Sequence, residues 1–235
     1  MTTLSIIVPV LNEADGIAPA LAALAPLRQR GVEVIVADGG STDGTIANAT
    51  PLCDRVVSAP RGRAMQMNAG AAVAAGDTLL FLHADTALPD KAGELADELI
   101  LTGLAKNGKK WGRFDVEITG RHPLLPMVAV LINLRSRLSG IATGDQAMFI
   151  TREAFTAAGG FPEIPLMEDI EFSRRLKHVS PPLCLRARVR TSGRRWDTHG
   201  LWFTIFLMWR LRLSYFLGAS PETLAQVYGY GRRKD

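Results

Sequence analysis

The sequence predicts an α/β protein: one domain with a mainly parallel central sheet, helices that flank the sheet, and a helical extension at the C-terminus. Short apolar runs recur along the first third of the chain, and each continues directly into polar residues. Continuous apolar runs are typical of strands buried on both faces, and strands that alternate with helices indicate parallel βαβ units. We therefore expect polar side chains to gather at the carboxyl ends of the strands, where α/β sheets bind ligands.

Size and composition agree with a folded globular protein. The chain has 235 residues, of which 47% are hydrophobic and 21% charged, a balance typical of folded rather than disordered proteins. No repeat or low-complexity linker divides it. We assign residues 1–198 to the sheet domain and residues 199–235 to the extension, within the same compact unit.

In the first half, the apolar runs predict strands at residues 4–10, 32–37, 55–58 and 78–82. The last of these runs into His83, Ala84 and Asp85. Helix formers predict a helix from Ile17 to Arg30 that is broken at Pro26, and a helix of small residues over 64–75 that packs closely on its neighbours.

In the second half, we expect a helix from Pro89 to about Leu104 and an alternating strand over 111–118. A helix over 123–138 and a short strand over 147–150 come next, followed by a helix that Thr151 caps. A charged helix over 167–177, a strand over 183–191 and an aromatic-rich helix over 201–217 complete the chain.

The formal charge of +4 is unevenly distributed. From Arg186 onward there are ten Lys or Arg residues against three Asp or Glu, so the preceding residues carry a net charge of −3. The basic excess therefore concerns a partner of the tail rather than of the whole chain. No recognition motif accompanies it, and we expect no nucleic-acid partner.

The cysteines and the N-terminus predict a cytoplasmic location. Cys53 and Cys184 form neither a metal-binding nor a disulfide pattern. The first residues lead straight into a strand-like segment without the features of a signal peptide. No apolar run reaches the roughly 18 residues that a membrane-spanning helix needs.

The candidate functional residues each have a structural explanation as well. The segment 9–13 is an ordinary strand-end turn, and 38–45 is a capped loop. Asp85 caps the segment after it, while Glu168 and Asp169 favour the start of a helix through its dipole. In the same structural interpretation, His199 only begins a helix and takes no part in catalysis or binding.

The order and spacing of the polar segments change this interpretation. The segments are Ser5–Glu13, Asp38–Thr45, Gly62–Gly70, His83–Asp85, Gly144–Asp145 and Glu168–Asp169. Together they resemble family 2 glycosyltransferases with the GT-A (Rossmann-like) fold, over roughly residues 4 to 175. More narrowly, the chain is similar to the short stand-alone bacterial members.

The resemblance implies an inverting transfer of a sugar from a nucleoside-diphosphate sugar to an acceptor hydroxyl. By the same resemblance, eight residues hold the donor nucleotide: Pro9, Asn12, Glu13, Asp38, Asp43, Arg63, Asn68 and Ala84.

The resemblance also assigns the metal and the catalytic acids. Asp85 matches the last acid of the family's Asp-x-Asp motif and would bind Mg²⁺ or Mn²⁺. His83 stands where that motif has its first acid, so the chain departs from the family pattern there. Asp169 matches the general base, and Glu168 is a neighbouring acid that raises its pKa. Gly144 and Asp145 would lie near the acceptor or the donor sugar.

The segment Ser192–Trp196 faintly resembles the Gln-x-x-Arg-Trp signature of processive relatives, with Ser in place of Gln. We do not infer processivity, because the long membrane-spanning segments of those enzymes are missing from this sequence. The segment still suggests that Arg194, Arg195 and His199 close over the diphosphate.

The helix Leu201–Leu217 has two interpretations of equal weight. Its aromatic residues and two Arg fit a helix that lies in a membrane interface, and Arg232, Arg233 and Lys234 add weak attraction to anionic lipid. It also fits a helix packed on the domain or in a dimer. The first interpretation implies a lipid or lipid-linked acceptor and a place on the inner face of the cell membrane.

Two other functions remain open. A sugar-nucleotide pyrophosphorylase has a related fold, but its first loop is expected to be Gly-rich and to contain Arg and Lys. This chain has Asn12 and Glu13 in that loop. A non-catalytic nucleotide-sugar-binding protein would not need both Asp85 and Asp169, although His83 keeps this alternative open.

Overall fold

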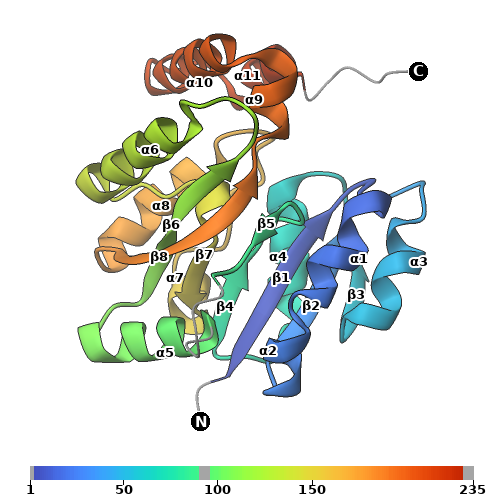
Figure 1. Cartoon of the computed structure of the whole chain (residues 1–235). Coiled ribbons are helices and arrows are strands. Elements are labelled where there is room, and N and C mark those ends of the chain that lie inside the picture. Colours follow the sequence, from blue (N-terminus) through green and yellow to red (C-terminus); the bar gives the residue numbers. More distant parts are fainter. Residues whose placement is uncertain (1–2, 90–95, 230–235) are drawn as a thin grey trace.

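The structure is a computed structural model that describes residues 3–89 and 96–229. Its central sheet lies between helices, and the C-terminal helices gather at one end of the molecule (Figure 1). The predicted helix segment 90–95 and the terminal residues Arg232, Arg233 and Lys234 lie outside the described residues.

The described chain forms an eight-stranded sheet with the order β3-β2-β1-β4-β7-β6-β8-β5. The strands are β1 (Leu4–Val10), β2 (Glu33–Asp38), β3 (Arg55–Ser58), β4 (Thr78–Phe81), β5 (Thr86–Ala87), β6 (Trp111–Thr119), β7 (Met148–Thr151) and β8 (Leu183–Ser192). The α/β prediction is confirmed, and every predicted strand is present. The two-residue β5 had no sequence signal because it is too short to show a period.

The sheet is mixed, with less parallel character than the sequence predicted. The first four strands in sheet order, β3, β2, β1 and β4, pair in parallel, as βαβ units require. Strand β7 runs antiparallel to both β4 and β6, and β5 runs antiparallel to β8. The β6–β8 pair is again parallel, with an irregularity between Phe114 and Asp115. The second half of the sheet therefore departs from the βαβ pattern.

Helices cover both faces of the sheet. One face packs against α1 (Ala14–Ala22), α2 (Ala25–Gln29), α5 (Ala96–Asn107) and α6 (Leu125–Ser139). The other face packs against α4 (Arg63–Val73), α7 (Arg152–Ala157) and α8 (Glu168–Val179). Alternate residues of β1 point to the two cores: Ile6 and Val8 to the first and Ile7 to the second. This alternation explains why the run reads as continuously apolar.

Helix α4 approaches β1 as closely as its small residues predicted. A Cβ atom on Gly70 would collide with the Ile7 side chain, so only Gly allows this separation. The break between α1 and α2 differs slightly from the prediction: it falls at Ala23 and Leu24, and Pro26 lies in the first turn of α2, where Pro is tolerated. The short helix α3 (Thr45–Ala49) follows β2.

The C-terminal extension consists of α9 (Arg194–His199), α10 (Leu201–Phe216) and α11 (Pro221–Tyr228). Leu211 of α10 and Leu224 of α11 are buried together with Met167 and Ile170 at the start of α8. The extension therefore packs on the domain, directly beside the acids Glu168 and Asp169. Within residues 3–89 and 96–229, every helix falls short of the length and apolarity that a membrane crossing requires.

Candidate active site

Two loops at the carboxyl ends of β1 and β2 are joined by hydrogen bonds. Asn12 has a left-handed backbone (φ 54°), and its Oδ1 accepts a hydrogen bond from the Thr42 N–H at 2.9 Å. Asp43 accepts hydrogen bonds from the N–H groups of Ala14 at 3.2 Å and Thr45 at 2.9 Å, and from the Thr45 hydroxyl. The Thr45 side-chain bond lowers the pKa of Asp43. The predicted residues Asn12 and Asp43 thus shape the loops themselves.

One side-chain amide, that of Gln66, holds the backbone at the carboxyl ends of both β1 and β2. The buried Gln66 of α4 donates its Nε2 protons to the carbonyl of Val10 at 2.6 Å and to that of Ala37 at 3.0 Å. Asp38, also buried, accepts hydrogen bonds from the N–H and the hydroxyl of Ser41. These contacts fix the strand-end loops before any ligand is present.

Pro9 and Ala84 contribute backbone rather than chemistry. Pro9 is buried in β1 opposite Ala37, one residue before the strand ends. Ala84 packs against the first core between His83 and Asp85. At the strand ends, both residues therefore offer a ligand only main-chain atoms and small side chains.

Charged groups from five separate segments come together at these loops. Arg194 Nη2 lies 3.7 Å from Glu13 Oε1. Partial burial raises the pKa of Glu13, the charge of Arg194 opposes that shift, and the charges of Asp85 and Asp43 reinforce it. The charge of Arg63, at the first position of α4, also acts on Glu13. The structure therefore brings together predicted donor-binding residues that are up to 181 positions apart in the sequence.

The acid pair Glu168 and Asp169 begins α8. It follows Met167, whose backbone is left-handed (φ 72°). Asp169 Oδ2 accepts a hydrogen bond from the Gly144 N–H at 2.9 Å, and Oδ1 accepts one from the Ile170 N–H at 2.7 Å. Asp169 is thus held in place by the main chain at a helix start, with Glu168 next to it.

Burial dominates the ionisation of this pair. It raises the pKa of Asp169, although the two backbone hydrogen bonds oppose the shift. It also raises the pKa of Glu168 to about 7, and the negative charge of Asp169 adds to the effect. The charge of Arg63 lowers both pKa values. A carboxylate whose pKa lies near neutrality is suited to general base catalysis at physiological pH.

His83 lies with the acid pair. The residues around a small cavity of about 10 Å³ include His83, Gly144, Glu168 and Asp169. A Cβ on Gly144 would collide with the imidazole ring, so ring and backbone are in close contact. Burial lowers the pKa of His83 to about 3, and the charge of Arg63 adds to this. His83 is therefore a neutral packing group at neutral pH and does not replace the charge of a carboxylate.

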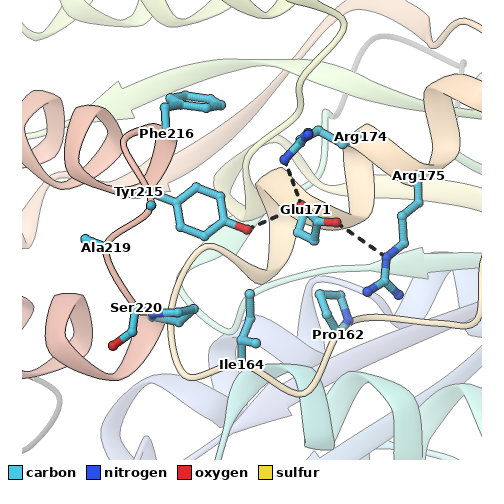
Figure 2. Close-up of a pocket in the computed structure, with 11 residues that line it drawn as sticks. Pro162, Ile164, Glu171, Arg174, Arg175, Tyr215, Phe216, Ala219 and Ser220 are labelled. Carbon is cyan, nitrogen blue, oxygen red and sulfur yellow. Dashed lines mark hydrogen bonds and ion pairs between the residues drawn. The ribbon is translucent and has the colours of Figure 1, made fainter.

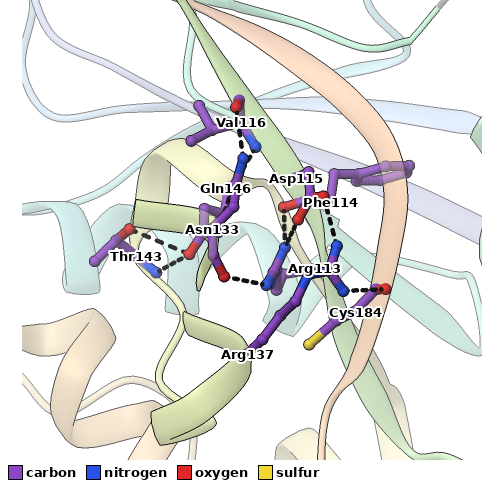
Figure 3. Close-up of polar contacts among 9 residues, drawn as sticks. All are labelled: Arg113, Phe114, Asp115, Val116, Asn133, Arg137, Thr143, Gln146 and Cys184. Atoms are coloured by element: carbon purple, nitrogen blue, oxygen red, sulfur yellow. Dashed lines mark hydrogen bonds and ion pairs between the residues drawn. The ribbon is translucent and has the colours of Figure 1, made fainter. Parts of the chain in front are cut away.

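A polar network joins Thr143 and Gln146, the residues on either side of the Gly144–Asp145 turn, to α6 and β6 (Figure 3). Asn133 of α6 pairs with both the N–H and the carbonyl of Val116 at 2.9 Å, and its Oδ1 accepts a hydrogen bond from Gln146 Nε2 at 3.3 Å. Gln146 in turn accepts a hydrogen bond from the Thr143 N–H at 3.2 Å. The turn that offers the Gly144 N–H to Asp169 is thereby tied to β6 and α6.

The same network contains a fully buried arginine. The Arg113 guanidinium forms an ion pair with Asp115 and donates to the carbonyls of Phe114 and Asn133, both at 3.2 Å. Asp115 is also paired with Arg137 at 2.5 Å. Such a buried, hydrogen-bonded network fixes the geometry around Gly144 more than it adds stability.

Asp145 and Arg135 lie next to the acid pair with unused polar atoms. Asp145 Oδ1 and Arg135 Nε and Nη2 are buried without a hydrogen-bond partner in the structure. The charges of Asp145 and Asp169 both act on Arg135, whose pKa burial lowers. Buried polar atoms without partners are uncommon, so this is a place where a polar group of a substrate would find partners.

Three predicted residues lie elsewhere. Asn68 holds a loop: its amide donates to the carbonyl of Phe161 and accepts from the N–H of the same residue, both at 2.9 Å. Arg195 stacks on the ring of Tyr228, 3.7 Å from its centroid. His199 stacks on Phe203. Of the three predicted diphosphate ligands, Arg194 reaches Glu13, whereas Arg195 and His199 contact the C-terminal helices.

The proposed metal ligand Asp85 is exposed at the lip of the strand ends. The described residues contain no group of three or more His, Cys, Asp or Glu side chains arranged to hold a metal ion. Mg²⁺, however, usually binds through one or two carboxylates plus substrate phosphates. Asp85, with Glu13 near it, fits that donor set when a diphosphate supplies the remaining oxygens.

A larger hollow of about 470 Å³ lies away from the strand ends (Figure 2). It lies between α8 and the α10–α11 connection. There Glu171 Oε2 accepts hydrogen bonds from the Tyr215 hydroxyl and from Arg174, both at 3.3 Å. Because none of the predicted donor-binding residues lines it, we do not assign the nucleotide to this hollow.

The sequence did not predict the buried polar residues that hold the loops of the site in place. Gln66 stands in a helix of small residues, Arg113 in an apolar alternation and Asn133 in an apolar helix. A polar residue at a position that the pattern marks as buried is a usable signal, because such groups need partners. The residue that a group will bond to depends on the fold and leaves no trace in the local sequence.

Residues 5–122, half of the chain, match the family model described as glycosyl transferase family 2. The chain belongs to glycosyl transferase family 2. A curated relative, an uncharacterized glycosyltransferase of Mycobacterium tuberculosis (strain CDC 1551 / Oshkosh), is 30% identical over an alignment of 193 positions that covers 78% of this chain and 72% of the relative. This confirms the family that the motifs predicted.

Two of the solved structures with the same fold contain a nucleotide sugar. The mannosyltransferase PcManGT from Pyrobaculum calidifontis, in complex with GDP-Man and Mn²⁺, is 18% identical with a TM-score of 0.63 and covers 97% of this chain and 69% of its own. S. aureus TarS 1-349, in complex with UDP-GlcNAc, is 19% identical with a TM-score of 0.65; the match covers 81% of this chain and 58% of that one.

A third similar structure is glucosyl-3-phosphoglycerate synthase from Mycobacterium tuberculosis, in complex with Mn²⁺, UDP and glucosyl-3-phosphoglycerate. It is 23% identical with a TM-score of 0.54, and the match covers 80% of this chain and 70% of that one. At these identities the three structures establish the GT-A fold of this chain.

Proposed function

We propose that this family 2 glycosyltransferase is an inverting, metal-dependent enzyme that transfers a sugar from a nucleoside-diphosphate sugar to an acceptor hydroxyl. The observation that carries the proposal is Asp169. It lies half-buried at the start of α8, oriented by the Gly144 N–H at 2.9 Å, and desolvation raises its pKa. Its neighbours Glu168 and His83 complete a confined site for a proton transfer.

The donor would bind on the strand-end loops. The similar structures hold GDP-Man with Mn²⁺, UDP-GlcNAc, or UDP with Mn²⁺, which supports a nucleoside-diphosphate donor here. The loops of Asn12 and Asp43 would face the nucleoside. Arg63 and Arg194, which both act on Glu13, would lie near the diphosphate, because guanidinium groups pair well with phosphate oxygens.

The chemistry would be one displacement. The acceptor oxygen forms a bond to the anomeric carbon while the bond from that carbon to the diphosphate oxygen breaks, and the diphosphate leaves with the electron pair. The proton of the acceptor hydroxyl passes to Asp169. Attack from the face opposite the leaving group gives inversion. A divalent cation held by Asp85 and the diphosphate would stabilise the charge on the leaving group.

The pKa shifts predict the pH dependence. Asp169 must be ionised to accept the proton, and its pKa is raised. The rate should therefore rise with pH through the range in which the acid pair loses its proton, which for Glu168 lies at about 7. The two acids titrate as a pair, so the profile reports both.

The acceptor would bind beside Asp145 and Arg135, whose buried polar atoms lack partners. We propose a lipid or lipid-linked acceptor, used at the inner face of the cell membrane. The acid pair also counts against a non-catalytic binding protein, since burying two acids with raised pKa values lowers stability at neutral pH. The same pair fits a pyrophosphorylase poorly, because that reaction needs no base to deprotonate a hydroxyl.

The experiment is a panel of UDP- and GDP-sugars, tested for thermal stabilisation of the protein with and without Mn²⁺. At least one should raise the melting temperature in a Mn²⁺-dependent way, and Asp85→Asn should remove the Mn²⁺ dependence. Glu171→Gln is the matched control, because Glu171 lines the separate hollow between α8 and α10. If no nucleotide sugar stabilises the protein under either condition, the proposal is wrong.

A further inference from the structure

Helix α10 exposes large apolar side chains along one side. Trp202 and Trp209 are 60% and 67% exposed, although the opposite side of the helix buries Leu201, Thr204 and Leu211. The exposed apolar residues are Trp202, Phe203, Phe206, Trp209, Leu213 and Phe216. Their spacing of three and four residues places them on one side of the helix. Aromatic residues this large are seldom left in water over four turns without a partner.

Helix α6 has the same character. Its exposed apolar residues are Met127, Val130, Leu131, Leu134 and Leu138, again spaced by three and four residues. The opposite side buries Leu125, Val128 and Ala129 in the first core. The outer side of this helix is therefore apolar, whereas a helix on the surface of a water-soluble protein normally has a polar outer side.

The two helices lie at the same end of the molecule (Figure 1). The buried sides of both belong to the first core, which includes Leu125 and Val128 of α6 and Leu201 of α10. The segment before α6 also bonds to α9, the helix that leads into α10: the Arg121 N–H donates to Asp197 Oδ1 at 3.0 Å. We refer to the outward sides of α6 and α10 together as the two-helix apolar surface.

The charged residues of α10 are both positive. Helix α10 contains Arg210 and Arg212 and no acid. Helix α6 contains no acid either, and its own arginines serve the site: Arg137 pairs with Asp115 and Arg135 is largely buried beside Asp145. At about 100° per residue, Arg210 and Arg212 flank the exposed stripe of α10 on its two sides. Tryptophan in the stripe and Arg at its margins are the composition of helices that lie in a membrane interface.

We propose that the two-helix apolar surface docks the enzyme on the surface of a bilayer that contains anionic lipid. A second copy of the chain is the weaker occupant. In a symmetric dimer this surface would meet itself, so its Arg residues would face one another, and neither helix carries an acid to pair with them. Anionic headgroups supply that missing negative charge.

Membrane docking would also specify the acceptor of the proposed glycosyl transfer, and this part of the inference rests on the proposed function. The buried side of α10 packs through Leu211 against Met167 and Ile170, the residues on either side of the acid pair. A docked α10 therefore keeps Asp169 within a helix diameter or so of the bilayer surface, roughly 10 Å. An amphiphilic acceptor could then present its hydroxyl to Asp169 while its hydrocarbon stays in the bilayer.

The test is co-sedimentation of the full chain with vesicles of phosphatidylcholine alone and of phosphatidylcholine with phosphatidylglycerol. The protein should bind the anionic vesicles, with weaker binding at high salt. Trp209→Glu and Leu134→Glu, one in each helix, should each weaken binding by about tenfold or more. Arg210→Gln should weaken it by about fivefold, the effect of one basic residue near an anionic surface.

Val179→Glu and Val227→Glu are matched controls, because they place the same charge on exposed apolar residues outside the surface. They should leave vesicle binding unchanged, and circular dichroism melts should show all variants folded. The proposal is overturned if the protein binds neither kind of vesicle. It is equally overturned if the protein is a dimer in solution that Trp209→Glu converts to monomers.

The donor panel separates this inference from the proposed function. Mn²⁺-dependent stabilisation by a nucleotide sugar is measured without vesicles and should persist in Trp209→Glu. If the donor binds and the vesicles do not, the membrane inference fails alone. If the vesicles bind and no donor does, the proposed function fails and the acceptor step falls with it.

Discussion

The strand-end loops and the two-helix apolar surface differ in whether their exposed groups have partners within the chain. In the loops, small polar groups find partners within the chain, as when Asp43 accepts the N–H groups of Ala14 and Thr45. On the apolar surface, side chains such as Trp209 remain 67% exposed. The donor side is therefore organised in advance, whereas the surface beside the acceptor side is completed only by something outside the chain. Substitutions on the two sides should accordingly behave differently.

The largest loss of stability is expected from Gln66→Ala. This change leaves the carbonyls of Val10 and Ala37 buried without their amide donor and opens a cavity below the strand ends. We expect the free energy of unfolding to fall by about 2–4 kcal/mol and donor affinity to fall with it. Urea denaturation measures the first effect and calorimetry the second. A loss below about 0.5 kcal/mol would show that the donor side does not depend on this amide.

Glu168→Gln should have an intermediate effect of opposite sign. The pKa of Glu168 is raised to about 7, so the wild-type protein loses stability as the pH rises from about 4.5 through 7. Gln removes the charge that burial opposes. The variant should be more stable than wild type by about 1–3 kcal/mol at pH 8 and nearly equal to it at pH 4.5. Denaturation at both pH values measures this, and a gain of equal size at both would contradict the assigned cause.

Asp43→Asn should have a smaller effect. Its hydrogen bond from Thr45 lowers the pKa of Asp43, so the contribution to stability is full above its unfolded pKa of about 4 and is lost as the pH falls below it. Asn should lower the melting temperature slightly at pH 7 and weaken donor binding. Melting curves at pH 7 and pH 3 measure the difference, which should be smaller at pH 3. A greater difference at pH 3 would reverse the assigned direction.

The smallest effect is expected from Phe206→Gln on the apolar surface. Phe206 is 66% exposed, so the free energy of unfolding without lipid should change by less than about 0.5 kcal/mol. Denaturation in the absence of vesicles measures it. A loss above about 1 kcal/mol would mean that Phe206 packs within the protein, and the contrast between the two regions would disappear.

The parts of the fold that local pattern decides were predictable. In the strands Leu4–Val10 and Thr78–Phe81, alternate residues face two different cores. Consecutive residues are therefore mostly apolar, and that pattern is visible in the sequence. The antiparallel β7 was not predictable as such, because a strand's direction depends on the path of α6 between β6 and β7. Helix α11 carried a clear Ser220 cap, yet its apolar side is too short to stand out.

The candidate site divides in the same way. Motif spacing named Asp85, Glu168 and Asp169, and the fold places the two acids together with raised pKa values. It also named Asn68, whose amide is used on Phe161, because spacing cannot tell a ligand-facing amide from a loop-holding one. The partnerless Arg135 had no signal, since it becomes unusual only when the fold buries it beside Asp145.

The most direct test of the account is Asp169→Asn, measured for donor binding and for transfer on the same preparation. Asn keeps an oxygen for the Gly144 N–H but cannot accept the acceptor's proton. We predict that transfer falls by about 10²–10⁴-fold while calorimetry shows the affinity for the nucleotide sugar with Mn²⁺ nearly unchanged. Transfer that persists at the wild-type rate, or loss of donor binding equal to the loss of transfer, would contradict the assignment of Asp169 as the base.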